Sequence, residues 1–450
     1  MNIIIVGGGL VGATLAEKLS GDGHNITLIE GDTEQARELA DRLDAHVIEG
    51  NGSTAAMLRR AGVENAGLLL GTTNSDDANM VVGILGTQLF KVPRVVVRLR
   101  DPKYSEGFSL LNQEHSSDYV CVNPDAAAVD RIFSLLEVPG ALDVVSFMED
   151  ELVVAGFRIA ASSDFAGLQV IHVQLLFAGA PTLVAAIRRA DNTWVIPSGQ
   201  DEIIAGDLVY FAIARTDLDN VLSLLGAARE QRQHIMVAGA GRVGLELAKR
   251  LEDVDAKVVL IEENPERARK AAEVLKHSLV ICGKVTDQTL LEEEEIERVS
   301  TFVAASSDNE NNLVAGLLAK RLGASRAFAV LDNPALVHLI GDVGIDAVIS
   351  PRLLAIGLIL QHIGGRNIHS YAALLEDEVE IIEVDAISGS KLTSGKLVNI
   401  GLPRGVLIAA LRRGEKLLVP RGDDRVEPGD RVLIISSTES AAKVSEFVGS

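Results

Sequence analysis

The chain has 450 residues, of which 47% are hydrophobic, and this is enough apolar surface for several globular cores. Its 42 Lys and Arg against 63 Asp and Glu give a net charge of −21, which makes nucleic acid and anionic lipid poor partners. Two cysteines, Cys121 and Cys282, imply no disulfide framework. We see no signal peptide and no apolar run of the ~18–20 residues that span a bilayer. We therefore expect a soluble, cytoplasmic protein that another protein would hold at a membrane.

The N-terminal residues predict a nucleotide-binding turn. Residues 2–6, NIIIV, are typical of a buried parallel strand, and residues 10–20 follow with helical periodicity. Gly7, Gly9 and Gly12 lie at the junction, and a second strand, residues 25–30, ends in Glu30. Strand, turn, helix and strand within about 30 residues are the context that the G-x-G-x-x-G fingerprint requires.

Each residue of this pattern has a physical role. Gly7 permits the tight turn, Gly9 leaves room for a phosphate, and Gly12 lets the helix pack close to the strand. The helix N-terminus offers N–H groups and partial positive charge to phosphates. Glu30 accepts hydrogen bonds from ribose hydroxyls and disfavours a 2′-phosphate, so the pattern favours NAD or an adenine nucleotide over NADP. The alternative is that the glycines serve only the turn and its packing.

Further strands at residues 45–50, 66–73 and 94–100 alternate with helical stretches, which predicts an α/β fold with a doubly wound parallel sheet. Ligands bind such sheets at the carboxyl ends of the strands. Arg98 and Arg100 lie at the carboxyl end of the fifth strand, where they would either hold phosphate or form a surface or inter-subunit salt bridge. The candidate nucleotide contacts are Gly7, Gly8, Gly9, Leu10, Val11, Gly12, Glu30, Asn51, Ser53, Thr72, Thr73, Asp76, Arg98, Arg100 and Lys103.

The next segments differ in character. Residues 123–141 and residues 350–366 each place a proline before a helix that is apolar on more than one face, which indicates a core helix or one at an interface, and we favour the interface. Short β-runs with turn signals at residues 151–170 and 179–214 predict a small α+β domain with hairpins. This domain shows no catalytic constellation. The related acidic turn at residues 423–430 is expected to be solvated rather than to bind an ion.

The second half of the chain repeats the first. Gly239, Gly241, Gly244 and Glu262 recur 232 residues after their counterparts, and Asp308 and Asn311 match Asp76 and Asn79 at the same offset. Residues 193–211 likewise match residues 416–434. The chain is therefore a tandem duplication. We divide it into Rossmann-like module A (residues 1–139), module B (140–228), Rossmann-like module A′ (233–365) and module B′ (366–450), with a polar linker at 227–233.

The second copy differs from the first at the end of the fifth strand. Val330 and Asp332 stand where Arg98 and Arg100 were, while Arg242 supplies charge from the turn itself. We expect a surviving second site with a different nucleotide preference or weaker binding. Its candidate contacts are Gly239, Gly241, Arg242, Val243, Gly244, Glu262, Lys284, Ser306 and Asp308.

Reaction machinery is missing from the sequence. None of the nine histidines recurs between the halves, no Cys/His cluster has metal-ligand spacing, and no P-loop or nucleophile elbow is present. We expect no catalytic residues and no metal. A nucleotide cradle without such machinery predicts a sensor and not an enzyme, and the alternative is an NAD-dependent oxidoreductase with module B as its substrate domain.

The motifs IIIVGGGLVGATLAEKL, ITLIE, GTTNSDDANMVVGILGTQL and RVVVRLRDPKY resemble the nucleotide-binding part of RCK (KTN) domains, and module B resembles their C-terminal part. Two such pairs in one chain are similar to the peripheral regulatory subunits of Trk potassium-uptake systems. The resemblance implies binding of NAD(H), ATP or ADP, and a homo-oligomeric ring (dimer or tetramer) at the inner face of the cell membrane. It also implies a membrane-embedded Trk-type partner whose pore the ring gates. A regulator of a cation/proton antiporter uses similar modules and is a further alternative.

Overall fold

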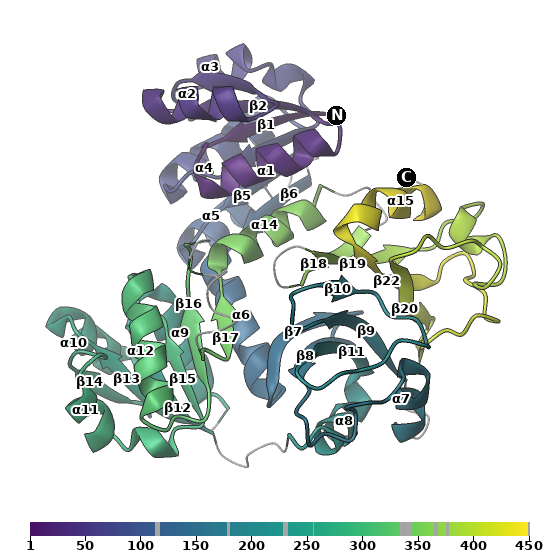
Figure 1. Ribbon diagram of the computed structural model, residues 1–450. Coiled ribbons are helices and arrows are strands. Elements are labelled where there is room, and N and C mark those ends of the chain that lie inside the picture. The colour runs from purple at the N-terminus through teal and green to yellow at the C-terminus, as the bar shows by residue number, and fades with distance from the viewer. Residues whose placement is uncertain are drawn as a thin grey trace. The chain divides into compact units, whose positions relative to one another are not determined.

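The computed structural model describes residues 1–112, 118–177, 181–227, 233–254, 256–333, 336, 344–363, 368–374 and 378–448 (Figure 1). The chain divides into two compact units: unit 1 contains residues 1–128 and 350–364, and unit 2 contains residues 129–349 and 365–450. The expected linker, apart from residues 227 and 233, lies outside the described residues. None of the helices within these ranges combines the length and the apolar character that a bilayer crossing requires.

Unit 1 contains the predicted doubly wound sheet. Its six strands are all parallel, in the order β3-β2-β1-β4-β5-β6. They are β1 (Asn2–Val6), β2 (Asn25–Glu30), β3 (His46–Glu49), β4 (Leu68–Gly71), β5 (Arg94–Arg98) and β6 (Asp118–Val122). The helices are α1 (Leu10–Gly21), α2 (Thr33–Arg42), α3 (Ala55–Arg60), α4 (Asp76–Ile84) and α5 (Pro102–Asn112), and α6 (Pro124–Glu137) runs on into unit 2.

The apolar run of β1 explains why this sheet is covered on both faces. Ile3 and Ile5 enter one hydrophobic core while Ile4 and Val6 enter another. Successive side chains of a strand point to opposite faces, so a strand without polar residues needs a core on each side. A run such as NIIIV therefore suits an inner strand that is covered on both faces, as it is here.

The helix α14 (Pro351–Gln361) belongs to module A′ in sequence, but it packs in unit 1. Its buried Ala355, Ile356 and Ile359 share a core with Leu15 and Leu19 of α1, and α14 lies along α1 in Figure 1. The second apolar face that its sequence displays is thus an interface between the halves of the chain. The compact units therefore differ from the four-part division, which stays a prediction.

Unit 2 holds the second parallel sheet, in the order β14-β13-β12-β15-β16-β17, which repeats the order of the first. The strands are β12 (His234–Ala238), β13 (Lys257–Glu262), β14 (Leu279–Cys282), β15 (Thr301–Ala304), β16 (Ala327–Val330) and β17 (Ala347–Ile349). The helices are α9 (Arg242–Glu252), α10 (Pro265–Val274), α11 (Gln288–Glu293) and α12 (Asn309–Arg321).

The C-terminal part of α6 packs against this second parallel sheet. Arg326 donates to the carbonyl oxygen of Leu135 over 3.1 Å, and Arg250 pairs with Asp130 over 2.6 Å and stacks on the ring of Phe133. The two linking helices are thus exchanged, since α14 of the second half packs in unit 1 and α6 of the first half reaches into unit 2.

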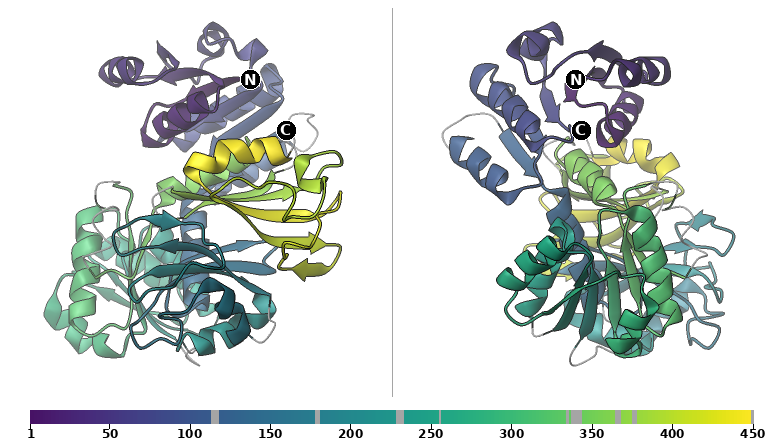
Figure 2. Two further views of the ribbon diagram at one scale, coloured as in Figure 1. Left: turned by 45° about the vertical axis from the view of Figure 1, so that its right-hand side comes forward. Right: turned by 90° about the vertical axis from the view of Figure 1, so that its left-hand side faces the viewer.

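Modules B and B′ form two antiparallel sheets with matching strand orders, β10-β9-β11-β8-β7 and β18-β19-β22-β20-β21. The first contains β7 (Ala141–Phe147), β8 (Leu152–Arg158), β9 (Thr182–Arg188), β10 (Trp194–Val195) and β11 (Leu208–Ala214), with α7 (Val170–Leu176) and α8 (Leu218–Leu224). The second contains β18 (Ile368–Ala373), β19 (Val379–Asp385), β20 (Val406–Arg413), β21 (Lys416–Leu418) and β22 (Arg431–Ser437), with α15 (Thr438–Val448). Tyr210 and Leu433 belong to one core, so the two sheets pack on each other (Figure 2).

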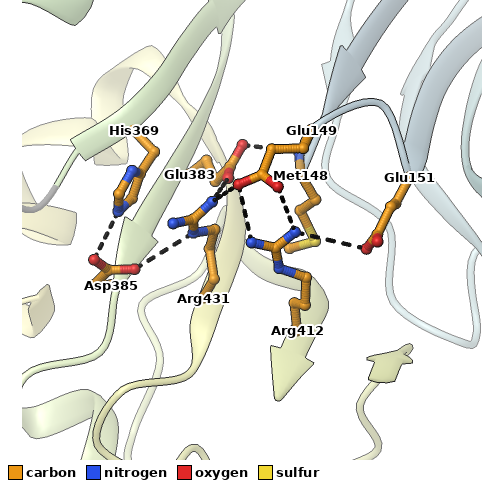
Figure 3. A network of polar contacts seen from close by, with 8 residues as sticks. All are labelled: Met148, Glu149, Glu151, His369, Glu383, Asp385, Arg412 and Arg431. Atoms are coloured by element: carbon orange, nitrogen blue, oxygen red, sulfur yellow. Dashed lines mark hydrogen bonds and ion pairs between the residues drawn. The ribbon is translucent and has the colours of Figure 1, made fainter. Parts of the chain in front are cut away.

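A polar network also joins modules B and B′ (Figure 3). The β7–β8 turn carries Glu149 at a positive φ of 57°. Its carboxylate accepts from Arg412 over 3.1 Å and from Arg431 over 2.9 Å, and these hydrogen bonds hold the pKa of Glu149 below its ordinary value. The buried carboxylate of Glu383 accepts from the Met148 N–H over 3.0 Å and lies 3.5 Å from Arg431. These charged groups are partly removed from water. Removing any one of them would leave its partner's charge uncompensated and would weaken the contact between modules B and B′.

The expectation of a solvated acidic turn at residues 423–430 is wrong for Asp430. That side chain is 2% exposed, and Arg413 donates to both of its oxygens over 2.9 and 2.7 Å. The guanidinium satisfies the carboxylate in a fork, so the turn is closed by a structural ion pair. Asp207 with Arg189 repeats the pair in module B.

Candidate nucleotide-binding sites

The three glycines of the first turn differ in what a side chain would meet. Gly7 has a φ of 103°, and a Cβ there would lie 2.8 Å from the backbone nitrogen of Thr73. A Cβ on Gly12 would lie 1.9 Å from the carbonyl oxygen of Gly7. A Cβ on Gly9 would meet no atom within 4 Å. The fold therefore requires Gly7 and Gly12, whereas Gly9 keeps open a space that no protein atom fills.

The helix that follows this turn lacks a side-chain cap. Gly9 is the N-cap of α1 and offers no side chain, whereas Asp32, Thr54 and Ser75 cap α2, α3 and α4. The first N–H groups of a helix have no partner within the helix, and they carry partial positive charge. The end of α1 at the glycine turn is thus suited to an anion.

Glu30 ends β2 beside the turn. One carboxylate oxygen accepts from the Gly8 N–H over 2.6 Å and the other from the Asp32 N–H over 2.9 Å. Each carboxylate oxygen has a further lone pair, so the group holds the turn in place and still has capacity to accept from ribose hydroxyls.

A cavity of about 450 Å³ opens at the carboxyl ends of β1, β2, β3 and β4. Its volume is within the range of small-molecule pockets. Its lining includes seven of the residues predicted from sequence: Gly7, Gly9, Glu30, Asn51, Ser53, Thr72 and Thr73. Gly8, Leu10, Val11 and Gly12 build the turn and the start of α1 behind it. The sequence analysis missed Gln35, whose amide nitrogen donates to the Gly8 carbonyl over 3.1 Å, and Asn74, which also lines the cavity.

Asn79 supports the cavity wall from behind and was not among the predicted contacts. Its side chain is fully buried, accepts from the Thr73 N–H over 2.9 Å and donates to the carbonyl oxygens of Thr73 and Arg98 over 2.9 and 2.8 Å. One amide thus ties the end of β4 to the end of β5. An asparagine recurs at the equivalent position of the second copy, and this recurrence is the feature of the sequence that could have identified Asn79.

The charged residues after β5 do not converge on the cavity as expected. Arg98 is 6% exposed and donates through Nη1 to the side-chain oxygen of Asn74, a residue of the cavity lining, over 3.4 Å. Arg100 and Lys103 are not among the lining residues. Asp76 accepts from the backbone N–H groups of Arg100 and of the residue after it, over 3.0 and 2.9 Å, so it fixes the chain after β5.

The second copy reproduces the turn. A Cβ on Gly239, at φ 104°, would lie 2.8 Å from Ser306, and one on Gly244 would lie 2.0 Å from the Gly239 carbonyl oxygen. Gly241 caps α9 without a side chain, and its Cβ would meet only an ordinary contact at 3.6 Å. Glu262 accepts from the Ala240 N–H over 2.7 Å, as Glu30 does from Gly8.

The predicted register of the repeat is wrong by one residue near Asp308. Asn312, not Asn311, accepts from Ser306 and donates to the Val330 carbonyl over 2.8 Å, as Asn79 does in the first copy. Asp308 is the N-cap of α12 and accepts from the Asn311 N–H, which is the role of Ser75. One extra residue before this segment moves the offset to 233, which spacing alone does not reveal.

The remaining predicted residues of the second copy lie at the start of α9 and just after β14. Val243 and Gly244 are buried in α9, and Arg242 is the first residue of that helix. Lys284 is exposed and lies 3.5 Å from Glu263. Within the described ranges, no three His, Cys, Asp or Glu side chains gather to hold a metal ion.

Comparisons with known proteins agree with this architecture. The TrkA-N domain model matches residues 3–130 and 235–351, and the TrkA-C domain model matches residues 381–449. The Trk system potassium uptake protein TrkA of Halomonas elongata is 34% identical over 96% of this chain and 95% of its own. Its namesake from Vibrio alginolyticus is 34% identical over 99% of this chain and 100% of its own.

Solved structures agree on the fold. The RCK domain of GsuK has a TM-score of 0.62 at 18% identity, covering 99% of this chain and 94% of that one. The GsuK channel bound to NAD has a TM-score of 0.62 at 17% identity, covering 99% and 78%. At this identity the likeness concerns the fold alone.

The fold and the two glycine turns define a duplicated RCK-type protein with a dinucleotide-type cradle in each half. The chain belongs to the TrkA family. Its named relatives are potassium uptake proteins and not enzymes, which supports the interpretation without catalysis.

Proposed function

We propose that this chain is the nucleotide-sensing regulatory subunit of a Trk-type potassium-uptake system. NAD(H), ATP or ADP binds at the two glycine turns, with phosphate at Gly9 and Gly241 and ribose at Glu30 and Glu262. Phosphate contacts the open N–H groups of α1 and α9, and the carboxylates disfavour a 2′-phosphate. Family membership and the space kept open at Gly9 together support this proposal.

The regulatory action follows from linked equilibria. A ligand shifts a protein between two conformations only by binding one of them more tightly. The exchanged helices α6 and α14 connect each half of the chain to the other, so a nucleotide in either half biases both. We propose a homo-oligomeric ring, dimer or tetramer, that transfers this bias to a membrane-embedded partner at the cytoplasmic face.

The test has a binding arm and a transport arm. Calorimetric titration of the purified chain with NADH, NAD, ATP and ADP is compared among the parent, Gly9→Asp and Gly241→Asp. Gly21→Asp is the matched control, since Gly21 ends α1 and its Cβ would also meet no atom within 4 Å. We expect each site variant to abolish one binding event and the control to retain both.

The transport arm measures potassium uptake in cells that depend on this chain as their regulator. The double variant Gly9→Asp, Gly241→Asp is expected to lose regulation while the partner remains in the membrane. Unaltered regulation in cells whose purified double variant binds no nucleotide would refute the sensing proposal. Steady oxidation of NADH with a small-molecule substrate would instead favour an oxidoreductase.

A further inference from the structure

The β7–β8 turn adopts a backbone conformation that its sequence disfavours. Met148, Glu149 and Asp150 are three consecutive residues with a positive φ, of 54°, 57° and 74°. The left-handed region is unfavourable for residues that carry a Cβ, and none of the three is glycine. Such a conformation persists only where the surrounding contacts over-determine it. The geometry of this turn therefore depends on the groups that hold it.

Module B′ holds one side of the turn (Figure 3). The carboxylate of Glu149 accepts from Arg412 and from Arg431, and the Met148 N–H donates to the buried carboxylate of Glu383. All three contacts join module B to module B′. A turn that relaxed to another conformation would release them.

Arg215 holds the other side of the turn from within module B. It is the first residue after β11. Its Nε donates to the carbonyl oxygen of Asp150 over 2.8 Å, and its Nη2 donates to the carboxylate of the same residue. Its Nη1 donates to the carboxylate of Glu137 over 3.0 Å. A guanidinium presents its N–H donors in one rigid plane, so a single side chain fixes Asp150 relative to Glu137.

The C-terminal end of α6, where Glu137 is the last residue, is held by module A′. Arg326 donates to the carbonyl oxygen of Leu135 over 3.1 Å, and the side-chain amide of Gln233 donates to that of Leu136 over 3.0 Å. The last carbonyl groups of a helix have no partner within the helix. Groups of module A′ supply these partners, so the position of Glu137 follows the position of module A′.

Helix α6 also contacts the helix of the second glycine turn. Helix α9 begins after Gly241, where the proposed phosphate binds, and carries Arg250 near its other end. Arg250 pairs with Asp130 of α6 over 2.6 Å and lies 4.8 Å from the centre of the Phe133 ring. A helix moves as a rigid element, so a shift of α9 at the nucleotide is felt by α6.

We propose that Arg215 couples the second nucleotide site to the contact between modules B and B′. This inference rests on the proposed function at that site. A nucleotide at Gly241 fixes α9 and, through Arg250, fixes α6. The bridge from Glu137 through Arg215 to Asp150 then keeps the β7–β8 turn in the conformation that binds module B′. Without nucleotide the bridge opens more often and the turn relaxes, so the turn is the two-state element that the ligand biases.

The experiment is hydrogen exchange, followed by mass spectrometry, on the full chain in a Gly9→Asp background, so that only the second site reports. Exchange of residues 147–152 is compared with and without saturating NADH or ADP, after calorimetry has measured the binding of each to every variant. The internal reference is the turn at residues 188–194. It also contains a left-handed residue, Asn192 at φ 67°, and it is closed by its own backbone, since the Arg189 N–H donates to the Thr193 carbonyl over 2.8 Å.

Two variants break the bridge at different points. Glu137→Ala removes the acceptor on α6, which is 53% exposed, and leaves Arg215 on Asp150. Arg215→Gln removes both contacts. Arg158→Gln is the matched control, because Arg158 is an exposed arginine at the end of β8 in the same module and donates to the Gly206 carbonyl over 3.0 Å.

We expect nucleotide to slow the exchange of residues 147–152 in the parent by about five- to 150-fold, the usual range of coupling between two sites. Arg158→Gln is expected to behave as the parent does. Glu137→Ala is expected to exchange like the unliganded parent and to lose the response to nucleotide. Arg215→Gln is expected to exchange faster than the parent and to lose that response as well.

A nucleotide response that persists in Glu137→Ala and in Arg215→Gln would overturn the proposal, since Arg215 would then be a merely structural support of the turn. Equal slowing of residues 147–152 and 188–194 in the parent would also overturn it, because the ligand would then stabilise the whole module. Either result leaves the proposed binding at the second site intact. Absence of calorimetric binding in the Gly9→Asp parent would instead refute the proposed function of the second site, and this inference with it.

Discussion

Two alanine substitutions, three residues apart, separate the folding role of the glycine turn from its binding role. Gly9 has φ −60° and ψ −177°, a conformation that alanine adopts without strain, and an added Cβ meets no atom within 4 Å. Gly12 is buried in α1, and its Cβ would lie 1.9 Å from a backbone oxygen and 2.8 Å from the hydroxyl of Thr72. Backbone cannot move aside as the end of a flexible side chain can.

We therefore expect Gly12→Ala to lower the free energy of unfolding of unit 1 by about 3 kcal/mol, the upper part of the range for overpacked cores. Gly9→Ala is expected to leave the unliganded protein as stable as the parent. Bound nucleotide separates Gly9→Ala from the parent. A ligand at a hundred times its Kd raises the free energy of unfolding of the parent by about 2.7 kcal/mol, and Gly9→Ala is expected to lack this increase.

The assay is urea unfolding of the parent and both variants, with and without NADH, in a Gly241→Asp background so that the second site is silent. The paired substitutions Gly241→Ala and Gly244→Ala, made in a Gly9→Asp background that silences the first site, repeat the contrast in the second copy, where the corresponding contacts are 3.6 and 2.0 Å. Full ligand stabilisation of Gly9→Ala would refute the placement of phosphate at Gly9. Parent-like stability of Gly12→Ala would refute the packing argument.

Three further predictions concern Asn79 at the first site, Arg431 between modules B and B′, and Glu252 at the end of α9. Asn79→Leu leaves buried backbone groups without partners, so we expect a loss of about 3 kcal/mol in urea unfolding and weaker binding at the first site; a purely local effect on stability with unchanged affinity would contradict the supporting role. Arg431→Met leaves the carboxylate of Glu383, 3% exposed, without its cation, and we expect unit 2 to lose about 3 kcal/mol, whereas exposed Arg421→Met should change little. Burial by itself would raise the pKa of Glu252, but the opposite effect of four hydrogen bonds is larger. The pKa is therefore lowered from its ordinary value of 4.5 to about 2. Its contribution to stability is complete above pH 4.5 and is lost as the pH falls toward 2, so Glu252→Gln should flatten the pH dependence of unfolding in that window, and an unchanged slope would argue against it.

The local sequence pattern was sufficient to predict the parallel sheets and the glycine turns. A run such as NIIIV requires cover on both faces, and the spacing of Gly7, Gly9 and Gly12 has one common structural context. These features depend on neighbours within about 30 residues, and the duplication displays them twice. The same local logic predicted Glu30 at the end of the second strand, where it holds the turn.

Contacts between segments that are distant in the sequence could not be predicted from local pattern. The sequence shows that α14 is apolar on more than one face, but not that its partner is α1 of the other half. The arginines after β5 carry the right charge for phosphate, yet the buried amide of Asn79 and the carboxylate of Asp76 fix the backbone there and leave Arg100 outside the cavity lining.

The sequence alone therefore determined that this protein has two doubly wound halves, each with a glycine turn and an acid at the next strand end. Hydrophobic period and glycine spacing are local properties, and they set which faces must be buried. The tertiary structure alone decided which surfaces bury them, through the exchange of α6 and α14, and so placed Arg352 of α14 in contact with Leu10 and Thr14 of α1. The hydrophobic effect is non-directional and acts between segments hundreds of residues apart. Which apolar surfaces bury each other is therefore settled only in the folded chain.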